Sequence, residues 1–168
     1  VGPRNKNETK KYKIMENSFS QSNQSGNYIV VVTNVAGSIT SVVATVTVLV
    51  PPTISAQPQA STIIQGENTS FSVGINGSSP LTYRWRLNGV LLAGGTNALL
   101  SLGNVQSNQS GGYSVIVTNT AGAVTSTVAT LTVLVPPSIL TQPLTQSVIQ
   151  NQSTPLSVLA SGTAPLSY

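Results

Sequence analysis

The residues that could carry out chemistry are few, because this sequence is almost uncharged. In residues 51–135 the charged side chains are Glu67, Arg84 and Arg86. General acid–base and nucleophilic catalysis need a titratable group beside the reacting atom. The chain has no histidine and no cysteine, and its last lysine is Lys13. The hydroxyl groups of residues 51–135 therefore have no base to activate them, and the sequence predicts that this segment is not an enzyme.

Metal and cofactor chemistry is disfavoured for the same reason. A site for a hard cation is built from several oxygen ligands, usually carboxylates. The sequence contains no aspartate and three acidic residues in all, and without cysteine it offers no thiolate ligand. We therefore expect no metal site and no cofactor.

The net charge of +4 comes from one end of the chain. Five basic residues lie within the first thirteen positions, namely Arg4, Lys6, Lys10, Lys11 and Lys13. Nucleic-acid binding needs a basic face spread over a folded surface, so we expect no nucleic-acid partner. Residues 1–16 are interpreted as an aberrant, solvated basic segment, with a functional basic arm as the alternative. No apolar run approaches the ~18 residues of a membrane span, so no membrane insertion is expected in this segment.

An internal repeat of 85 residues organises the rest of the chain. Tyr28 maps onto Tyr113 at this offset (113 − 28 = 85), and the flanking residues correspond almost letter for letter. The same offset relates Pro51-Pro52 to Pro136-Pro137, Gln57-Pro58 to Gln142-Pro143, and Tyr83 to Tyr168. The repeat predicts the C-terminal half of one unit at 17–50, a complete unit at 51–135 and the N-terminal part of a third unit at 136–168.

Short apolar–polar alternations indicate that the complete unit is all-β. Turn signals recur every eight to twelve residues, which is the spacing of a sandwich. Val and Thr are abundant and charged residues make up 6% of the chain, so strands with one wet face are favoured over disorder. The expected strands are 53–57, 61–64, 68–75, 81–87, 90–92, 100–105, 111–119 and a long last strand that ends at Val135.

The complete unit resembles the immunoglobulin fold. The resemblance rests on Tyr83-Arg84-Trp85, the Asn88-Gly89 turn, Leu100-Ser101-Leu102, and Ser110-Gly111-Gly112-Tyr113-Ser114-Val115. Tandem bacterial immunoglobulin-like (I-set-like) repeats are most similar, with their Pro-Pro junctions and Val-Thr-Asn-x-Ala-Gly hairpins. The resemblance implies β-sandwich repeats in a linear array, and an extracellular location, either secreted or on the cell surface.

The sequence departs from the family at the disulfide that usually joins the two sheets. Both cysteine positions are valine here, Val73 and Val115, and Gln109 stands where an acidic residue is usual. We expect Trp85 to pack over the two valines at the centre of the core. The predicted core residues are Phe71, Val73, Trp85, Leu100, Leu102, Tyr113, Val115 and Val117.

Two functional interpretations follow from this architecture. In the first, the units are inert spacers in a larger protein that present other domains, and their partners are the neighbouring repeats of the same chain. In the second, the unit is an adhesive module that binds a protein or glycan through loops 77–80, 94–97 and 121–122. Arg84 and Arg86 could contact a ligand, or they could be ordinary solvated strand residues.

Two features of the repeat are compatible either with strand pairing inside one chain or with strand pairing between two chains. The Thr-rich last strands, 40–50 and 125–135, either pair fully inside the sandwich or accept a partner's strand. The partial units at 17–50 and 136–168 could also complement each other between chains, head to tail.

Overall fold

The computed structural model describes residues 21–168, so the basic segment at 1–16 lies outside the described residues. The described chain is all-β, which confirms the predicted fold class. It divides into two compact units, and the boundary lies between Leu49 and Val50. Residues 21–168 contain only two helical segments, each a three-residue 3₁₀ turn, and none has the length and apolarity that crossing a bilayer requires.

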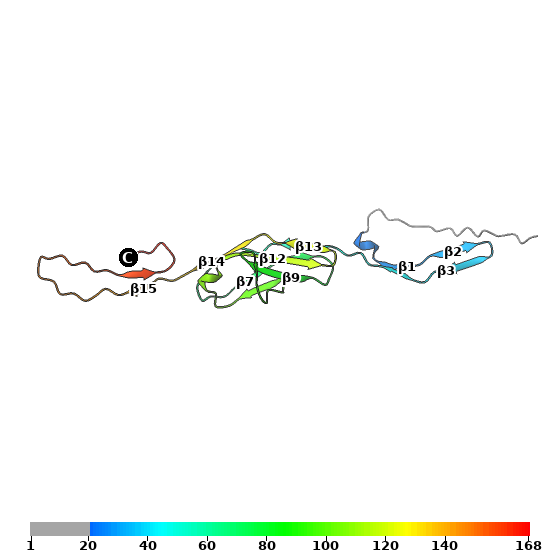
Figure 1. Cartoon of the computed structure of the whole chain (residues 1–168). Helices are drawn as coiled ribbons and strands as arrows, with labels where there is room; N and C mark the ends of the chain where they lie inside the picture. The colour runs from blue at the N-terminus through cyan, green and yellow to red at the C-terminus, as the bar shows by residue number, and fades with distance from the viewer. Residues whose placement is uncertain (1–20) are drawn as a thin grey trace, which may run out of the picture. The chain divides into compact units, whose positions relative to one another are not determined.

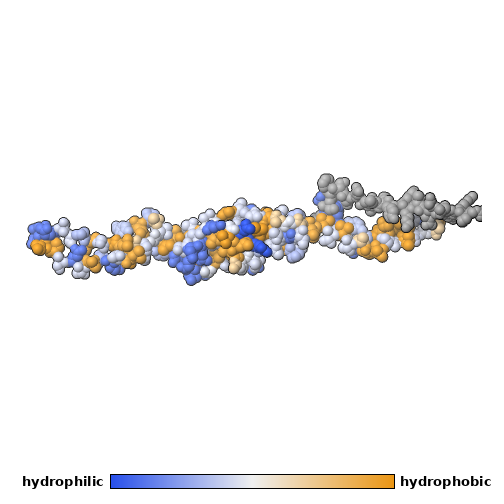
Figure 2. Space-filling view, viewed as in Figure 1, coloured by the Kyte–Doolittle hydropathy of each residue, from blue (hydrophilic) through white to orange (hydrophobic). Residues whose placement is uncertain are grey.

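The first unit consists of paired short strands (Figure 1). Its elements are η1 (Ser22–Gln24), β1 (Gly26–Tyr28), β2 (Val31–Asn34), β3 (Gly37–Thr40) and β4 (Ala44–Val46). β2 pairs with β3 and β1 pairs with β4, both antiparallel. Apolar side chains of this unit remain at its surface, as the orange areas of Figure 2 show; Val31, for example, is 57% exposed.

The complete unit contains two sheets. Its strands are β5 (Thr53–Ala56), β6 (Ser61–Ile64), β7 (Thr69–Ser72), β8 (Gly74–Asn76), β9 (Thr82–Leu87), β10 (Val90–Leu91), β11 (Leu99–Leu102), β12 (Gly111–Asn119), β13 (Gly122–Thr125) and β14 (Ala129–Leu134). One sheet has the order β10-β9-β12-β14-β6, with β13 paired to β12. The second layer is built from two strand pairs, β7 with β11 and β8 with β5. The two pairs are adjacent because only Val73 separates β7 from β8.

The last strand differs from the prediction, because it is split at Ser126. Ser126 replaces one rung of the ladder: its N–H donates to the Val115 carbonyl (2.9 Å), and its Oγ accepts from the Val115 N–H (3.0 Å). A hydroxyl that accepts a backbone hydrogen bond competes with the regular ladder. The predicted single strand is therefore β13 followed by β14, which ends at Leu134.

The edge of the last strand is covered within the unit. β14 pairs antiparallel with β12 on one side and parallel with β6 on the other. Of the two expectations for residues 125–135, the structure has the one in which the strand pairs inside the sandwich. β12 pairs with Ala129–Leu131 and β6 with Leu131–Leu134, so every residue of β14 is paired within the unit.

The core lies between the two sheets and collects the large side chains. Trp85, Val105, Val115 and Val117 are completely buried. The remaining buried apolar residues are Phe71, Val73, Leu100, Tyr113, Ala129, Leu131 and Val133, and Leu102 is only partly buried. Val105 was expected in a strand, but β11 ends at Leu102 and Val105 enters the core from a loop, held by hydrogen bonds to Glu67 and Gly66.

Trp85 sits where the sheet register places it against Val115. The two residues are direct partners in the β9–β12 pairing, so their side chains share the inner face. The indole Nε1–H donates to the Asn97 carbonyl (2.8 Å), and the ring centroid lies 6.3 Å from that of Phe71. The indole thus buries its surface with its one polar atom satisfied.

Tyr113 closes the corner before β12. Its hydroxyl donates to the Gln109 carbonyl (2.9 Å), and its ring stacks on Phe71 at 4.7 Å between centroids. Tyr28 repeats the bond in the first unit by donating to the Gln24 carbonyl (2.7 Å). Burial raises the pKa of the Tyr113 phenol above its ordinary value, because the phenolate would lose its hydration.

This environment predicts a loss of stability at alkaline pH. The unfolded chain releases the Tyr113 proton near pH ~10, whereas the folded unit holds it to a higher pH. The free energy of unfolding should therefore fall as the pH rises above ~10. At pH 8, Tyr113→Phe should lower the free energy of unfolding by about 1 kcal/mol, because the hydrogen bond to Gln109 is lost. Between pH 8 and pH 11, the variant should lose less stability than the parent, because it has no phenol to titrate at this position. Urea unfolding at the two pH values checks this, and an equal alkaline loss in both proteins would contradict it.

The C-terminal residues repeat the opening of the complete unit. β15 (Ser138–Thr141) and β16 (Leu159–Ser161) pair antiparallel, as β5 and β8 do. Both pairs carry a register shift, between Ile139 and Thr141 in one and between Ile54 and Ala56 in the other. The 85-residue repeat of the sequence is therefore also a repeat of local structure.

Candidate functional site: the junction that precedes the complete unit

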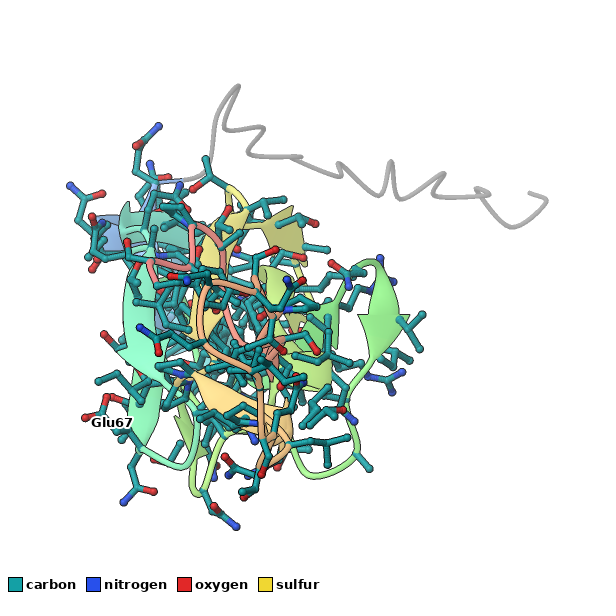
Figure 3. All side chains as sticks on the ribbon, turned by 90° about the vertical axis from the view of Figure 1, so that its left-hand side faces the viewer. Glu67 is labelled. Carbon is teal, nitrogen blue, oxygen red and sulfur yellow. The ribbon has the colours of Figure 1, made fainter. Side chains whose placement is uncertain are left out.

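The charged residues of the complete unit do not converge on a catalytic site. Glu67 is exposed in the turn between β6 and β7 (Figure 3), where its Oε2 accepts a hydrogen bond from the Ile64 N–H (2.9 Å). Its carboxylate thus stabilises a turn. Within residues 21–168, no three His, Cys, Asp or Glu side chains are grouped closely enough to hold a metal ion.

Arg84 and Arg86 lie on β9, on the face opposite Trp85. Arg84 is exposed and Arg86 is half-buried. The register sets Arg84 against Ile116 and Arg86 against Ser114, both on β12. Arg86 Nε is buried and has no hydrogen-bond partner in the described part of the chain. Arg86 Nε is therefore not accessible to a ligand, and we assign no binding role to the pair.

The most extensive polar arrangement lies at the pole where the chain enters the complete unit. Val50, which precedes the two prolines, donates its N–H to Ser78 Oγ (2.9 Å). In return, the Ser78 N–H donates to the Val50 carbonyl (3.0 Å). The connecting backbone is thus bonded to the loop between β8 and β9.

Asn119 joins a second loop to the same backbone. Its Nδ2 donates to the carbonyls of Val50 (2.8 Å) and Ser78 (2.9 Å). Its Oδ1 accepts from the N–H groups of Ala121 (2.9 Å) and Gly122 (3.1 Å) in the β12–β13 turn. One side chain therefore connects the turn, the β8–β9 loop and the connecting backbone.

Gly77 allows the prolines to approach the β8–β9 loop. Its φ is +153°, and a Cβ there would lie 3.0 Å from Pro52 Cα and 3.2 Å from the Pro51 carbonyl oxygen. Real Cβ atoms are rarely found so close to backbone atoms, so a larger residue would push the prolines away. Pro52 is itself buried.

The second Pro-Pro junction has the same construction. Val135 donates its N–H to Thr163 Oγ1 (2.6 Å), and the Thr163 N–H donates to the Val135 carbonyl (2.9 Å). Gly162, with φ +151°, would place a Cβ 3.0 Å from Pro137 Cα. Thr163 keeps the hydroxyl of Ser78, 85 positions earlier. The junction residues were not predicted from the sequence, and this recurrence of a hydroxyl residue at the repeat offset is the signal that marks them.

Comparison with known proteins identifies the fold of the complete unit. A family model described as an immunoglobulin domain matches residues 51–119. The titin I-band fragment I67–I69 superposes with a TM-score of 0.74 at 23% identity, covering 87% of this chain and 54% of that fragment. The complete unit has the immunoglobulin-like fold.

Two human proteins are similar to this chain in sequence. Hemicentin-1 of Homo sapiens is 33% identical over 143 residues, which are 81% of this chain and 2% of hemicentin-1. Roundabout homolog 3 of Homo sapiens is 27% identical over 153 residues, 88% of this chain and 11% of that protein. The chain thus spans a small fraction of the curated relatives it matches.

The loops predicted for ligand binding are occupied by contacts inside the immunoglobulin-like domain. Loop 77–80 and turn 121–122 belong to the junction described above. In loop 94–97, the Gly95 carbonyl accepts the Trp85 N–H (3.0 Å), and the Asn97 carbonyl accepts the indole N–H. Their backbone groups therefore support the fold, which leaves fewer of them for a ligand.

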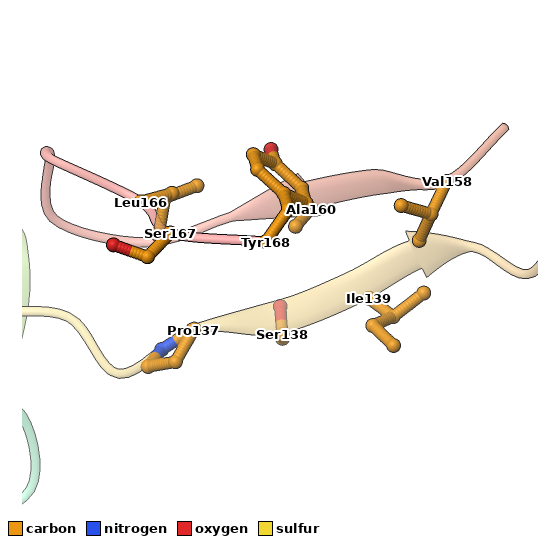
Figure 4. Close-up of a pocket in the computed structure, with 8 residues that line it drawn as sticks. All are labelled: Pro137, Ser138, Ile139, Val158, Ala160, Leu166, Ser167 and Tyr168. Atoms are coloured by element: carbon orange, nitrogen blue, oxygen red, sulfur yellow. The ribbon is translucent and has the colours of Figure 1, made fainter.

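An apolar groove is lined by residues of β15 and β16 and by residues 166–168 (Figure 4), and the repeat explains its apolar character. Its lining residues are Pro137, Ser138, Ile139, Val158, Ala160, Leu166, Ser167 and Tyr168. At the repeat offset, Val158 corresponds to Val73 and Ile139 to Ile54, which belong to or pack against the core of the immunoglobulin-like domain. The groove is therefore the counterpart of a core surface, and we do not assign it a ligand.

Proposed function

We propose that this chain is a non-catalytic structural segment: tandem immunoglobulin-like repeats that act as spacers in a larger secreted or cell-surface protein and present its other domains. Its partners are the neighbouring repeats of the same chain. A spacer needs a stable folded unit and a connecting backbone of restricted flexibility, and it needs no catalytic side chain. The low charge and the engaged loops of the complete unit agree with it.

The observation that carries the proposal is the bonded backbone at both Pro-Pro junctions. A flexible tether leaves its connecting peptide free, whereas here Val50 and Val135 have both backbone polar groups bonded to the following loop. Residues before proline are in addition restricted to extended conformations. A connection of this kind suits a spacer, because each unit then follows the last with little slack.

The proposed location and type of array have separate support. Relatives such as hemicentin-1 and Roundabout homolog 3 are extracellular or cell-surface proteins. The Pro-Pro junctions and the Val-Thr-Asn-x-Ala-Gly hairpins favour tandem repeats of the bacterial kind, although the similar proteins named above are human. The domain division at 17–50, 51–135 and 136–168 is part of this proposal.

The proposal is tested with proteins in which Val50 is followed by one, two or three copies of residues 51–135, so that each junction keeps the natural Val-Pro-Pro sequence. The buried cluster lies wholly within this segment. Small-angle scattering should show the maximum dimension growing by roughly 35–40 Å per copy, the length of strands of ten to twelve residues at ~3.3 Å each. A compact profile that does not lengthen with copy number would overturn the spacer role.

The same proteins should be silent on a glycan array and in pull-downs from extracellular fractions. Saturable, specific retention of a glycan or protein by the single unit would favour the adhesive interpretation instead. In that case, substitutions in loops 77–80, 94–97 and 121–122 would show whether the predicted loops carry the binding.

A further inference from the structure

Val50 is held at every backbone polar group it has. Its carbonyl accepts two hydrogen bonds, from the Ser78 N–H (3.0 Å) and from Asn119 Nδ2 (2.8 Å). Its N–H donates to Ser78 Oγ (2.9 Å). Prolines restrict their own φ and disfavour the helical region for the residue before them. They do not fix the orientation of the peptide group between Val50 and Pro51, whereas these bonds do.

The amide of Asn119 fits this position in one orientation only. Its Oδ1 faces two N–H donors, those of Ala121 and Gly122, and its Nδ2 faces two carbonyls, those of Val50 and Ser78. Exchanging the oxygen and nitrogen would set donor against donor and acceptor against acceptor. Both ends of the side chain are thus engaged, and the β12–β13 turn orients the end that bonds the connecting backbone.

We propose that Asn119 is the positioning residue of the junction: its amide locks the peptide group of Val50 to the pole of the complete unit. The direction in which the connecting backbone leaves the domain is then set by this side chain and Ser78, with the Pro-Pro pair contributing less. This inference gives a mechanism to the proposed spacer role and rests on that role for its biological meaning.

The second junction provides a comparison inside the same chain. Val135 has the two bonds to Thr163 that match those of Val50 to Ser78. The hydroxyl and backbone pairing is therefore a repeated feature of the chain, and Asn119 adds two further hydrogen bonds to it at the first junction.

Amide hydrogen exchange of the full chain, resolved by NMR, tests the proposal. Asn119→Ala should speed exchange at Val50 and Ser78 about 3- to 10-fold, the effect expected for losing a neutral hydrogen bond. Val135 and Thr163 should not change. Asn108→Ala is the matched control, because Asn108 is exposed in η2 (Ser107–Gln109), away from the junction.

Asn119→Asp separates the two ends of the side chain. The carboxylate can still accept from Ala121 and Gly122, but it presents oxygen to the carbonyls of Val50 and Ser78. We expect at least the Asn119→Ala effect at Val50 and Ser78, with the amides of Ala121 and Gly122 as protected as in the parent. A uniform increase that includes Val115 and Val117 in the core would show general destabilisation and overturn the positioning role.

Unchanged exchange at Val50 and Ser78 in both variants would likewise overturn the inference, while leaving the scattering test of the spacer role intact. Conversely, if the single unit bound a specific ligand, the spacer role would fail and the exchange pattern would still report whether Asn119 holds the junction.

Discussion

Replacing Trp85 by alanine should remove a large part of the free energy of unfolding of the complete unit. Trp85 is completely buried, and truncating a buried aromatic side chain to alanine costs about 3–5 kcal/mol. A domain of this size has a total stability of only about 4–13 kcal/mol. No disulfide joins the sheets, since the corresponding positions are Val73 and Val115, so nothing covalent limits the loss.

The measurement is thermal and urea unfolding of residues 50–135, followed by circular dichroism because the variant lacks the fluorophore. The midpoint should fall by more than about 12 °C, at roughly 4–8 °C per kcal/mol for a domain of this length. The midpoint of Trp85→Phe should lie between those of the parent and Trp85→Ala, because phenylalanine retains apolar volume but leaves the Asn97 carbonyl without its donor. Val90→Ala, at a residue that is 71% exposed, is the control. A Trp85→Ala midpoint within a degree or two of the parent would contradict the packing described here.

Replacing Gly111 by alanine should strongly destabilise the unit. The φ of Gly111 is +148°, and a Cβ there would lie 2.5 Å from Asn88 Oδ1 and 2.9 Å from Asn88 Cγ. Asn88 cannot move away cheaply, since its Oδ1 accepts the Gly112 N–H and its own N–H donates to the Gly112 carbonyl. Backbone strain and overpacking together should cost about 2–4 kcal/mol.

Gly103→Ala is the matched control for this substitution. Its Cβ would meet nothing closer than Asn68 Oδ1 at 3.5 Å, and its φ is not in the left-handed region. Its stability should be unchanged or slightly higher, because alanine restricts the unfolded chain. Equal urea midpoints for Gly111→Ala and the parent would mean that the β9–β10 turn adapts without cost.

The alternation of apolar and polar residues predicted the centre of the fold well. Trp85, Tyr113, Val115 and Val117 were assigned to the core from period-two patterns, and each is almost completely buried. The pattern works in the middle of paired strands, because successive side chains point to opposite faces. It fails where pairing ends: Leu102 is the last residue of β11 and is partly buried, while Val105 enters the core outside any strand.

Polar side chains that replace backbone partners could not be assigned in this way. Ser126 interrupts the last strand because its hydroxyl accepts the Val115 N–H, and nothing in the alternation of residues 125–135 distinguishes it from the neighbouring threonines. The junction is a similar case. Val50, Ser78 and Asn119 are far apart in sequence, and only the fold brings their polar groups within 3.0 Å of one another.

The sequence by itself determined the scarcity of charged side chains, the 85-residue repeat and the all-β class, because composition and periodicity are local properties that can be read without coordinates. The tertiary structure alone decided which of many serines and asparagines hold the connecting backbone. A hydroxyl or an amide has the same chemistry at the surface and at a junction. Its role depends on whether the fold sets a complementary donor or acceptor within hydrogen-bonding distance, and that geometry arises only when loops distant in sequence meet at one pole of the domain.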